Sequence, residues 1–272
     1  MTEVVIEAEK RDGLGLRELV DARELLLFLV WREIRVRYAH TVLGVLWTVL
    51  QPLATMALFT IIFSRLTNVA PPGVPYPMFA LIGLVAWSYV AGAVAGSAES
   101  LIANPTLITK VYFPRLAIPL APVGAGLLDF AVSSALLILG LLYYRIVPSF
   151  PRVLLVVPIT TLLVLATAGI GVFLSAANLR FRDARYTIPF ALQLWFFGSP
   201  IAYSLSSLPD RYRTLFLLNP LAGIIEGYRA ALLPDVPLEW SHLGGAALTS
   251  VLLFVTGVVY FRGAERSFAD LA

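Results

Sequence analysis

Cysteine is absent from this chain of 272 residues, and lysine occurs only at Lys10 and Lys110. The missing cysteine excludes a disulfide scaffold and any metal site built on thiolates. Neither lysine stands in the Gly-Lys-Ser/Thr context of a P-loop, so the chain carries no Walker-type ATPase. Histidine is also scarce, and His40 and His242 are too far apart in sequence to predict a histidine-rich metal site.

Charge is the second deficit of the sequence. Only 14% of the residues are charged and 59% are hydrophobic, whereas a soluble domain carries about 25% charged residues. The composition excludes a soluble globular domain, whose surface needs more charge, and it excludes intrinsic disorder because apolar residues are abundant. It predicts an all-α polytopic membrane protein.

Long runs without charge locate the spans, because a helix needs about 20 mostly apolar residues to cross a bilayer. Such runs predict six transmembrane helices, over residues 42–64, 78–98, 117–143, 153–177, 188–205 and 243–261. An even number places both termini on one side. That side carries 14 lysines and arginines, so both termini are predicted to be cytoplasmic. The other side carries six, namely Arg65, Arg145, Arg152, Arg211, Arg213 and Arg229.

The whole chain is predicted to form one transmembrane domain. Its parts are a cytoplasmic N-terminus at 1–40, a six-helix membrane core at 42–261 and a cytoplasmic tail at 262–272. Within the first part, residues 14–38 predict an amphipathic helix whose apolar face carries Leu27, Trp31, Ile34 and Tyr38. Its run of apolar residues is too short to cross a bilayer, so this helix should lie in the membrane interface. It serves either as a docking surface for a cytoplasmic partner or as an anchor alone.

The second cytoplasmic loop predicts a short helix. Asn104 can cap this helix, Pro105 suits its first position, and Pro114 would end it. Exposed apolar residues such as Leu107 and Tyr112 suit insertion into the groove of a partner. Packing of the helix against its own spans is the alternative.

The external stretch 206–241 is too apolar for a free loop and too interrupted by proline to span. Asn219 followed by Pro220 predicts the start of a helix. We expect half-helices that re-enter the outer leaflet. Irregular backbone at membrane depth must be buried in protein or line a wet cavity. The stretch therefore either borders a pathway or forms a plug that only packs.

Two features within the spans need a physical reason. Asp129 lies near the middle of the third span, where a charge is costly and must face protein or water. It is either hydrogen-bonded inside the bundle or part of a polar pathway. In the fifth span, one helical face carries Pro189, Gln193, Phe196, Phe197, Pro200 and Tyr203. Such an aromatic face either packs against other helices or stacks on sugar rings.

Several spaced motifs resemble those of the ABC-2 type permeases. They are the run Trp-Arg-Glu-Ile-Arg-Val-Arg-Tyr at 31–38, the run Lys-Val-Tyr-Phe-Pro-Arg at 110–115, and Ser-Pro-Ile-Ala-Tyr at 199–203. Within that family they resemble the branch that exports lipid-linked polysaccharides such as O-antigen, teichoic acid and capsule. The resemblance extends over about residues 25–262.

The resemblance implies a complex in which two copies of the chain form a channel. Two separate cytoplasmic ATPase subunits bind ATP and magnesium and drive transport, so this chain needs no cofactor and is not itself an enzyme. The cargo would be a polysaccharide on an undecaprenyl diphosphate lipid, and O-antigen is the first expectation. The alternatives are export of teichoic acid or capsular polysaccharide, or export of a drug or a simple lipid. The complex would lie in the bacterial cytoplasmic (inner) membrane, and nucleic acid is not an expected partner.

The resemblance also implies roles for individual residues, with no catalytic residue and no metal ligand among them. Coupling to the ATPase falls to Asn104, Leu107, Ile108, Lys110 and Tyr112. The interface helix and the contact with the lipid diphosphate fall to Trp31, Arg32, Arg35, Arg37 and Tyr38. The channel lining and the gate fall to Gln193, Phe196, Phe197, Tyr203, Asn219 and Glu226. The arginines either pair with phosphate or serve only as positive-inside anchors.

Two other classes of protein fit the sequence less well. A membrane-embedded hydrolase would need a nucleophile with a histidine partner, and the chain has no Gly-x-Ser-x-Gly run. A secondary transporter that does not use ATP commonly shows internal repeats, and we find none in this sequence.

Overall fold

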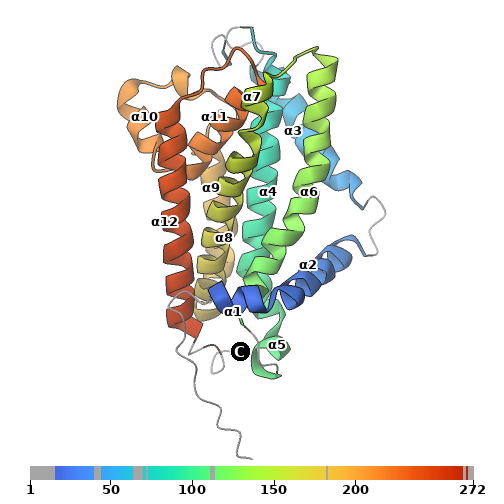
Figure 1. Cartoon of the computed structure of the whole chain (residues 1–272), viewed down its shortest axis with the longest axis vertical. Helices are drawn as coiled ribbons and strands as arrows, with labels where there is room; N and C mark the ends of the chain where they lie inside the picture. Colours follow the sequence, from blue (N-terminus) through green and yellow to red (C-terminus); the bar gives the residue numbers. More distant parts are fainter. Residues whose placement is uncertain are drawn as a thin grey trace, which may run out of the picture.

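The computed structural model describes residues 16–39, 44–63, 70–71, 73–110, 114–181, 183–265 and 268. Over these residues the secondary structure is helical, with no strand. The long helices stand side by side as a bundle (Figure 1). The short helix α5 (Pro105–Lys110) lies at one end, and α7 (Phe150–Val153), α10 (Asp210–Phe216) and α11 (Pro220–Leu232) lie toward the other. We refer to these ends as the α5 end and the α11 end.

Five helical segments within the described residues are long and apolar enough to cross a membrane. They are α3 (Leu46–Phe63), α4 (Tyr76–Ala103), α6 (Ala117–Tyr143), α7 with α8 (Val156–Arg180), and α12 (Trp240–Ala264). These confirm five of the six predicted apolar helices, with boundaries moved by a few residues. The prediction for 117–143 coincides with α6.

The helix predicted over 188–205 differs from the structure. Helix α9 spans Ala184–Phe197, only 14 residues, and an irregular segment follows it up to Ser204. At 1.5 Å per residue, α9 is about 21 Å long, which is shorter than a hydrocarbon core of about 30 Å. The sequence Gly198-Ser199-Pro200 explains the end of the helix, because proline removes a backbone donor and glycine favours helix termini.

Helix α4 lies at the centre of the bundle, and α3 is the least buried of the long helices. In the most apolar window of α4, 72% of the residues are buried, against 6% in that of α3. Large apolar side chains of α3, among them Trp47, Leu58 and Ile61, are exposed. Such a face can only be covered by lipid or by another chain.

Helices α8 and α12 approach each other backbone to backbone. A Cβ atom added to Gly169 would collide with the main chain of Leu253 and Phe254. A Cβ atom added to Gly257 would collide in turn with the carbonyl of Gly169. Glycine at both positions therefore permits this crossing, as small residues do in other membrane helices.

The predicted N-terminal amphipathic helix consists of two helices, α1 (Leu16–Asp21) and α2 (Arg23–Tyr38), separated at Ala22. Helix α2 crosses the bundle obliquely near the α5 end (Figure 1). It packs on α6 through Leu29, which is buried. Of the predicted apolar face, Leu27 and Trp31 are exposed, whereas Ile34 and Tyr38 are half-buried, and Tyr38 contacts α6.

Candidate functional site

A groove of about 310 Å³ lies between α3, α4 and α9. Its lining mixes hydrogen-bonding side chains with aromatic rings in an otherwise apolar wall. The hydrogen-bonding side chains are those of Gln51, Thr55, Ser88 and Gln193, and the rings are those of Trp87 and Phe196. Amides and hydroxyls both donate and accept hydrogen bonds. The groove can therefore hold a ligand that has polar groups on its rim and apolar faces.

The predicted aromatic face of α9 divides between the groove and the surface. The ring of Phe196 lies 5.4 Å from Trp87 and 6.0 Å from Phe59, between α4 and α3. The ring of Phe197 lies 5.2 Å from Phe196, and Phe197 is 66% exposed. Gln193 and Phe196 thus line the groove together, whereas Phe197 points outward from the same helix.

Asn219 ties the end of α9 to the start of α11. Its side-chain oxygen accepts hydrogen bonds from Leu221 N (3.1 Å) and from Trp195 Nε1 (3.0 Å). Its side-chain nitrogen donates to the Gly198 carbonyl and to Ser199 Oγ, each at 3.0 Å. The predicted helix start at Asn219 and Pro220 is confirmed. The same side chain also fixes the segment at which α9 stops.

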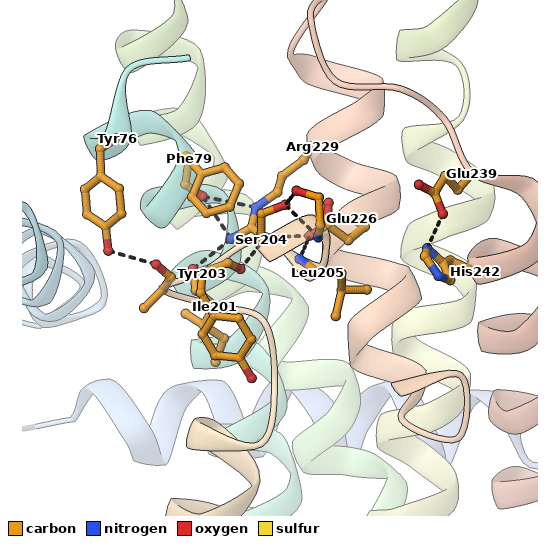
Figure 2. Close-up of polar contacts among 12 residues, drawn as sticks. Tyr76, Phe79, Ile201, Tyr203, Ser204, Leu205, Glu226, Arg229, Glu239 and His242 are labelled. Atoms are coloured by element: carbon orange, nitrogen blue, oxygen red, sulfur yellow. Dashed lines mark hydrogen bonds and ion pairs between the residues drawn. The ribbon is translucent and has the colours of Figure 1, made fainter. Parts of the chain in front are cut away.

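Arg229 of α11 is fully buried and donates hydrogen bonds to the irregular segment that follows α9. Its guanidinium donates to the carbonyls of Ile201 (2.7 Å), Tyr203 (3.3 Å) and Phe79 (3.4 Å). It also lies 3.4 Å from the centroid of the Phe79 ring. Figure 2 shows these contacts, with Phe79 on α4 and the irregular segment on either side of the guanidinium. A single side chain therefore satisfies three carbonyls from two separate parts of the chain.

Glu226, one turn before Arg229, completes this cluster (Figure 2). Its Oε1 atom lies 3.0 Å from Arg229 Nη1 and accepts a hydrogen bond from Leu205 N at 3.3 Å. Tyr203, another predicted gate residue, donates from its hydroxyl to the Phe197 carbonyl at 3.2 Å. Buried backbone without partners is costly, and more so in lipid. The pair from α11 supplies donors to the Ile201 and Tyr203 carbonyls and an acceptor to Leu205 N, all of which lie in the segment after α9.

The three arginines of α2 that were predicted to contact the lipid diphosphate have different partners. Arg32 Nη2 donates to Asn104 Oδ1 at 2.9 Å. Arg37 Nη1 lies 2.5 Å from Asp129 Oδ2 on α6, and the hydroxyl of Tyr38 donates to the other oxygen of Asp129. The Arg35 guanidinium lies 5.8 Å from the Trp31 ring. Two of the predicted phosphate-contacting arginines are thus paired within the protein, and Asp129 is bonded inside the bundle.

The structure describes the side chains of only some of the residues predicted to couple to the ATPase. Helix α5 begins at Pro105, as expected. The Asn104 side chain bonds Arg32 and the Ser100 carbonyl, so it links α2 to the end of α4. Leu107 is half-buried against the bundle's own core. Ile108 and Lys110 belong to α5, but their side chains, like all of Tyr112, lie outside what the structure describes.

Sequence reasoning did not pair Asp129 with Arg37 and did not single out Arg229 or Trp87. Arg229 was counted with the external positive charges, yet it is buried. The spacing of Glu226 and Arg229, three apart within an apolar stretch, was the available signal. In the described part of the chain, no group of three histidine or acidic residues could hold a metal ion.

Comparison with known proteins gives a consistent result. The family model described as ABC-2 type transporter matches residues 24–233. The O-antigen export system permease protein RfbA of Myxococcus xanthus is 34% identical over 258 residues, covering 93% of this chain and 97% of that protein. The protein of the same name from Klebsiella pneumoniae is 30% identical, covering 91% and 95%. The polysialic acid transport protein KpsM of Escherichia coli is 28% identical, covering 87% and 92%.

The chain therefore belongs to the ABC-2 type transporter family, whose members are membrane permeases. The matched residues include α2, α4, α6, α8, α9 and α11, so they contain the groove, the Arg229 cluster and the Arg37–Asp129 pair. The family resemblance noted in the sequence is confirmed.

Proposed function

We propose that this chain is the membrane subunit of an ATP-driven exporter of lipid-linked polysaccharide, with O-antigen as the cargo. The relatives named for O-antigen export cover nearly the whole chain. The observation that carries the proposal is the groove between α3, α4 and α9. A sugar ring has hydroxyls at its edge and an apolar C–H face, which suit the Gln51 and Gln193 amides and the rings of Trp87 and Phe196.

A second copy of the chain completes the pathway in this proposal. The groove is open, and both of its outer walls carry exposed apolar residues, including Ile61 on α3 and Phe197 on α9. A long glycan needs a continuous passage, and two such grooves facing each other would enclose one. Helix α9 and the irregular segment up to Ser204 together form the predicted fifth span, with α10 and α11 as re-entrant gate helices.

The energy source lies outside this chain in the proposal. Two cytoplasmic ATPase subunits bind ATP and magnesium and dock at the α5 end, against α2 and α5. The asymmetry of lysine and arginine supports a cytoplasmic location for this end and for both termini, in a bacterial inner membrane. Arg32 and Asn104 join α2 to the end of α4 at this place. A displacement of α5 or α2 by the ATPase would therefore be transmitted to α4, at the centre of the bundle.

The cargo is tested by depleting the protein in its own host and analysing the lipid-linked glycans of the membrane. We expect a diphosphate-linked glycan to accumulate on the cytoplasmic side while the matching surface polymer disappears. The sugars of that glycan would distinguish O-antigen from capsule, for which the similarity to polysialic acid transport proteins is the supporting observation. Intact surface glycans without accumulation would overturn the proposal.

The groove itself is tested by a matched pair of threonines. Thr55 lines the groove, and Thr256 is exposed on α12; both hydroxyls donate to the carbonyl four residues earlier. Thr55→Val combined with Gln193→Leu should lower export at least several-fold at unchanged protein level. Thr256→Val should leave export unchanged. Equal export by all variants would remove the groove from the pathway.

A further inference from the structure

Arg37, Tyr38 and Asp129 form a polar cluster at the junction of three helices. Arg37 and Tyr38 come from the end of α2 and Asp129 from α6. A Cβ atom added to Gly96 of α4 would lie 3.9 Å from Arg37 Nη2, so the guanidinium also lies beside α4. Asp129 is near the middle of α6, about 18 Å along the helix from Ala117. The cluster therefore lies well inside the bundle rather than at its end.

The cluster is incompletely enclosed. The side chain of Arg37 is 27% exposed and that of Asp129 is 19% exposed. The described partners of the Arg37 guanidinium are carboxylates: Asp129 at 2.5 Å and Glu33 at 3.7 Å. A guanidinium has five N–H donors and binds carboxylate and phosphate in the same planar geometry. An incoming phosphate can therefore take the position that a carboxylate holds.

We propose that Asp129 is an exchangeable counter-ion that makes the Arg37–Tyr38 pair selective for a phosphate-bearing lipid headgroup. In the free protein, Asp129 neutralises Arg37 at membrane depth and orients Tyr38. A phosphate on a passing lipid competes with Asp129 for the guanidinium and the phenol. A lipid with a neutral headgroup brings no charge with which to displace Asp129, so it does not bind. The inference rests on the proposed function, since it concerns the headgroup of that cargo.

The counter-ion also sets how firmly the headgroup is held. A buried arginine without a partner would be costly, and a diphosphate bound to it without competition would be released slowly. Asp129 avoids both situations because it occupies the arginine before the lipid arrives and repels the diphosphate once it is bound. This predicts that removing the carboxylate strengthens binding, whereas a carboxylate that only supports the fold would not have this effect.

The test is equilibrium binding of farnesyl diphosphate, a polyprenyl diphosphate without a glycan, to the full chain in lipid nanodiscs. Farnesol, which lacks the phosphates, is the neutral control ligand. We expect wild-type protein to bind the diphosphate and not farnesol. Asp129→Asn, which keeps the shape and removes the charge, should bind the diphosphate roughly ten-fold more tightly, corresponding to about 1.4 kcal/mol. Arg37→Gln should bind at least ten-fold more weakly.

Glu33→Gln is the matched control, because it also removes a carboxylate beside Arg37 but at 3.7 Å. Its affinity should remain within about three-fold of wild type. An Asp129→Asn protein that binds no more tightly than wild type would overturn the inference. If Asp129→Asn does not fold, Asp129→Ser is measured instead; failure of both to fold would make Asp129 a structural counter-ion and would also overturn it.

Export in cells separates this inference from the proposed function. Asp129→Asn should bind tightly and export slowly, because release is impaired. Tight binding by Asp129→Asn in a host whose surface glycans do not depend on the protein would leave the phosphate site standing and refute the polysaccharide cargo. Dependence of the glycans on the protein, without tighter binding by the variant, would refute the counter-ion and keep the cargo.

Discussion

Arg229 and Arg37 are two arginines beside carboxylates in different parts of the bundle, and their surroundings differ. The Arg229 side chain has no exposed surface and bonds three main-chain carbonyls in addition to Glu226. The Arg37 side chain is 27% exposed, and its described partners are carboxylates. The Arg229 cluster is thus held by bonds to backbone, and the Arg37 cluster by bonds between side chains.

The difference determines what each cluster can do. Carbonyls of Ile201 and Tyr203 cannot leave Arg229 unless the segment after α9 unfolds, so this cluster holds α4, α9 and α11 together. A carboxylate partner, by contrast, can be replaced by another anion while the backbone stays in place. We infer that the Arg229 cluster moves as one unit in any opening of the α11 end, and that the Arg37 cluster exchanges partners.

The largest effect is expected from Arg229→Met. It leaves Glu226 without its cation and removes the donor to the Ile201 and Tyr203 carbonyls, and removing one partner of a buried ion pair costs about 3–5 kcal/mol. Thermal unfolding of the purified protein in detergent should show a much lower midpoint. Arg152→Met is the control, because Arg152 also donates to two carbonyls but is only half-buried. Equal midpoints for the two variants would contradict the conclusion that Arg229 holds α4, α9 and α11 together.

An intermediate effect is expected from Asn219→Ala. It removes the cap of α11 and the bonds to Trp195, Gly198 and Ser199. Loss of a helix cap costs about 0.5–2 kcal/mol, so the unfolding midpoint should fall less than in Arg229→Met. Asn219→Asp keeps the accepting oxygen and loses the donating nitrogen, and it should lie between Asn219→Ala and wild type. Equal midpoints for Asn219→Asp and Asn219→Ala would contradict this order and show that the two donated bonds, and not the cap, carry the effect of Asn219.

The smallest effect is expected at the other cluster, from Glu33→Gln. The pair of Glu33 and Arg37 is partly exposed and 3.7 Å long, and such pairs on a helix contribute about 0.3–0.5 kcal/mol. The midpoint of thermal unfolding should therefore change little. A drop as large as that of Asn219→Ala would mean that the Arg37 cluster stabilises the fold as much as the contacts of Asn219 do, and it would contradict the difference between the two clusters.

The sequence predicted the parts of this structure that depend on local composition. Uncharged runs located five apolar helices, and Asn219 with Pro220 located the start of α11, because span length and helix capping are local properties. The helix predicted over 188–205 was too long, since hydropathy continues through residues 198–205 although the helix ends at Phe197. Backbone there is stabilised by Asn219 and Arg229, which hydropathy does not register.

Pairs that join distant residues were beyond sequence reasoning. Asp129 was recognised as needing a partner, but Arg37 lies 92 positions away and no periodicity connects them. Arg229 was assigned to the external charges because charge counting treats every arginine as exposed. Gln193 and Phe196 were correctly placed on one face, yet the groove also needs Gln51 and Trp87 from other helices.

The most direct test of the contrast between the two arginines is to measure thermal unfolding and glycan export for Arg229→Lys and Arg37→Lys side by side. Lysine keeps the charge but cannot reproduce the planar fork of donors. We predict a strongly lowered unfolding midpoint for Arg229→Lys, because one ammonium cannot serve three carbonyls and Glu226. Arg37→Lys should keep a midpoint near wild type and export more slowly. A midpoint lowered as much in Arg37→Lys as in Arg229→Lys, or unchanged in both, would contradict the account.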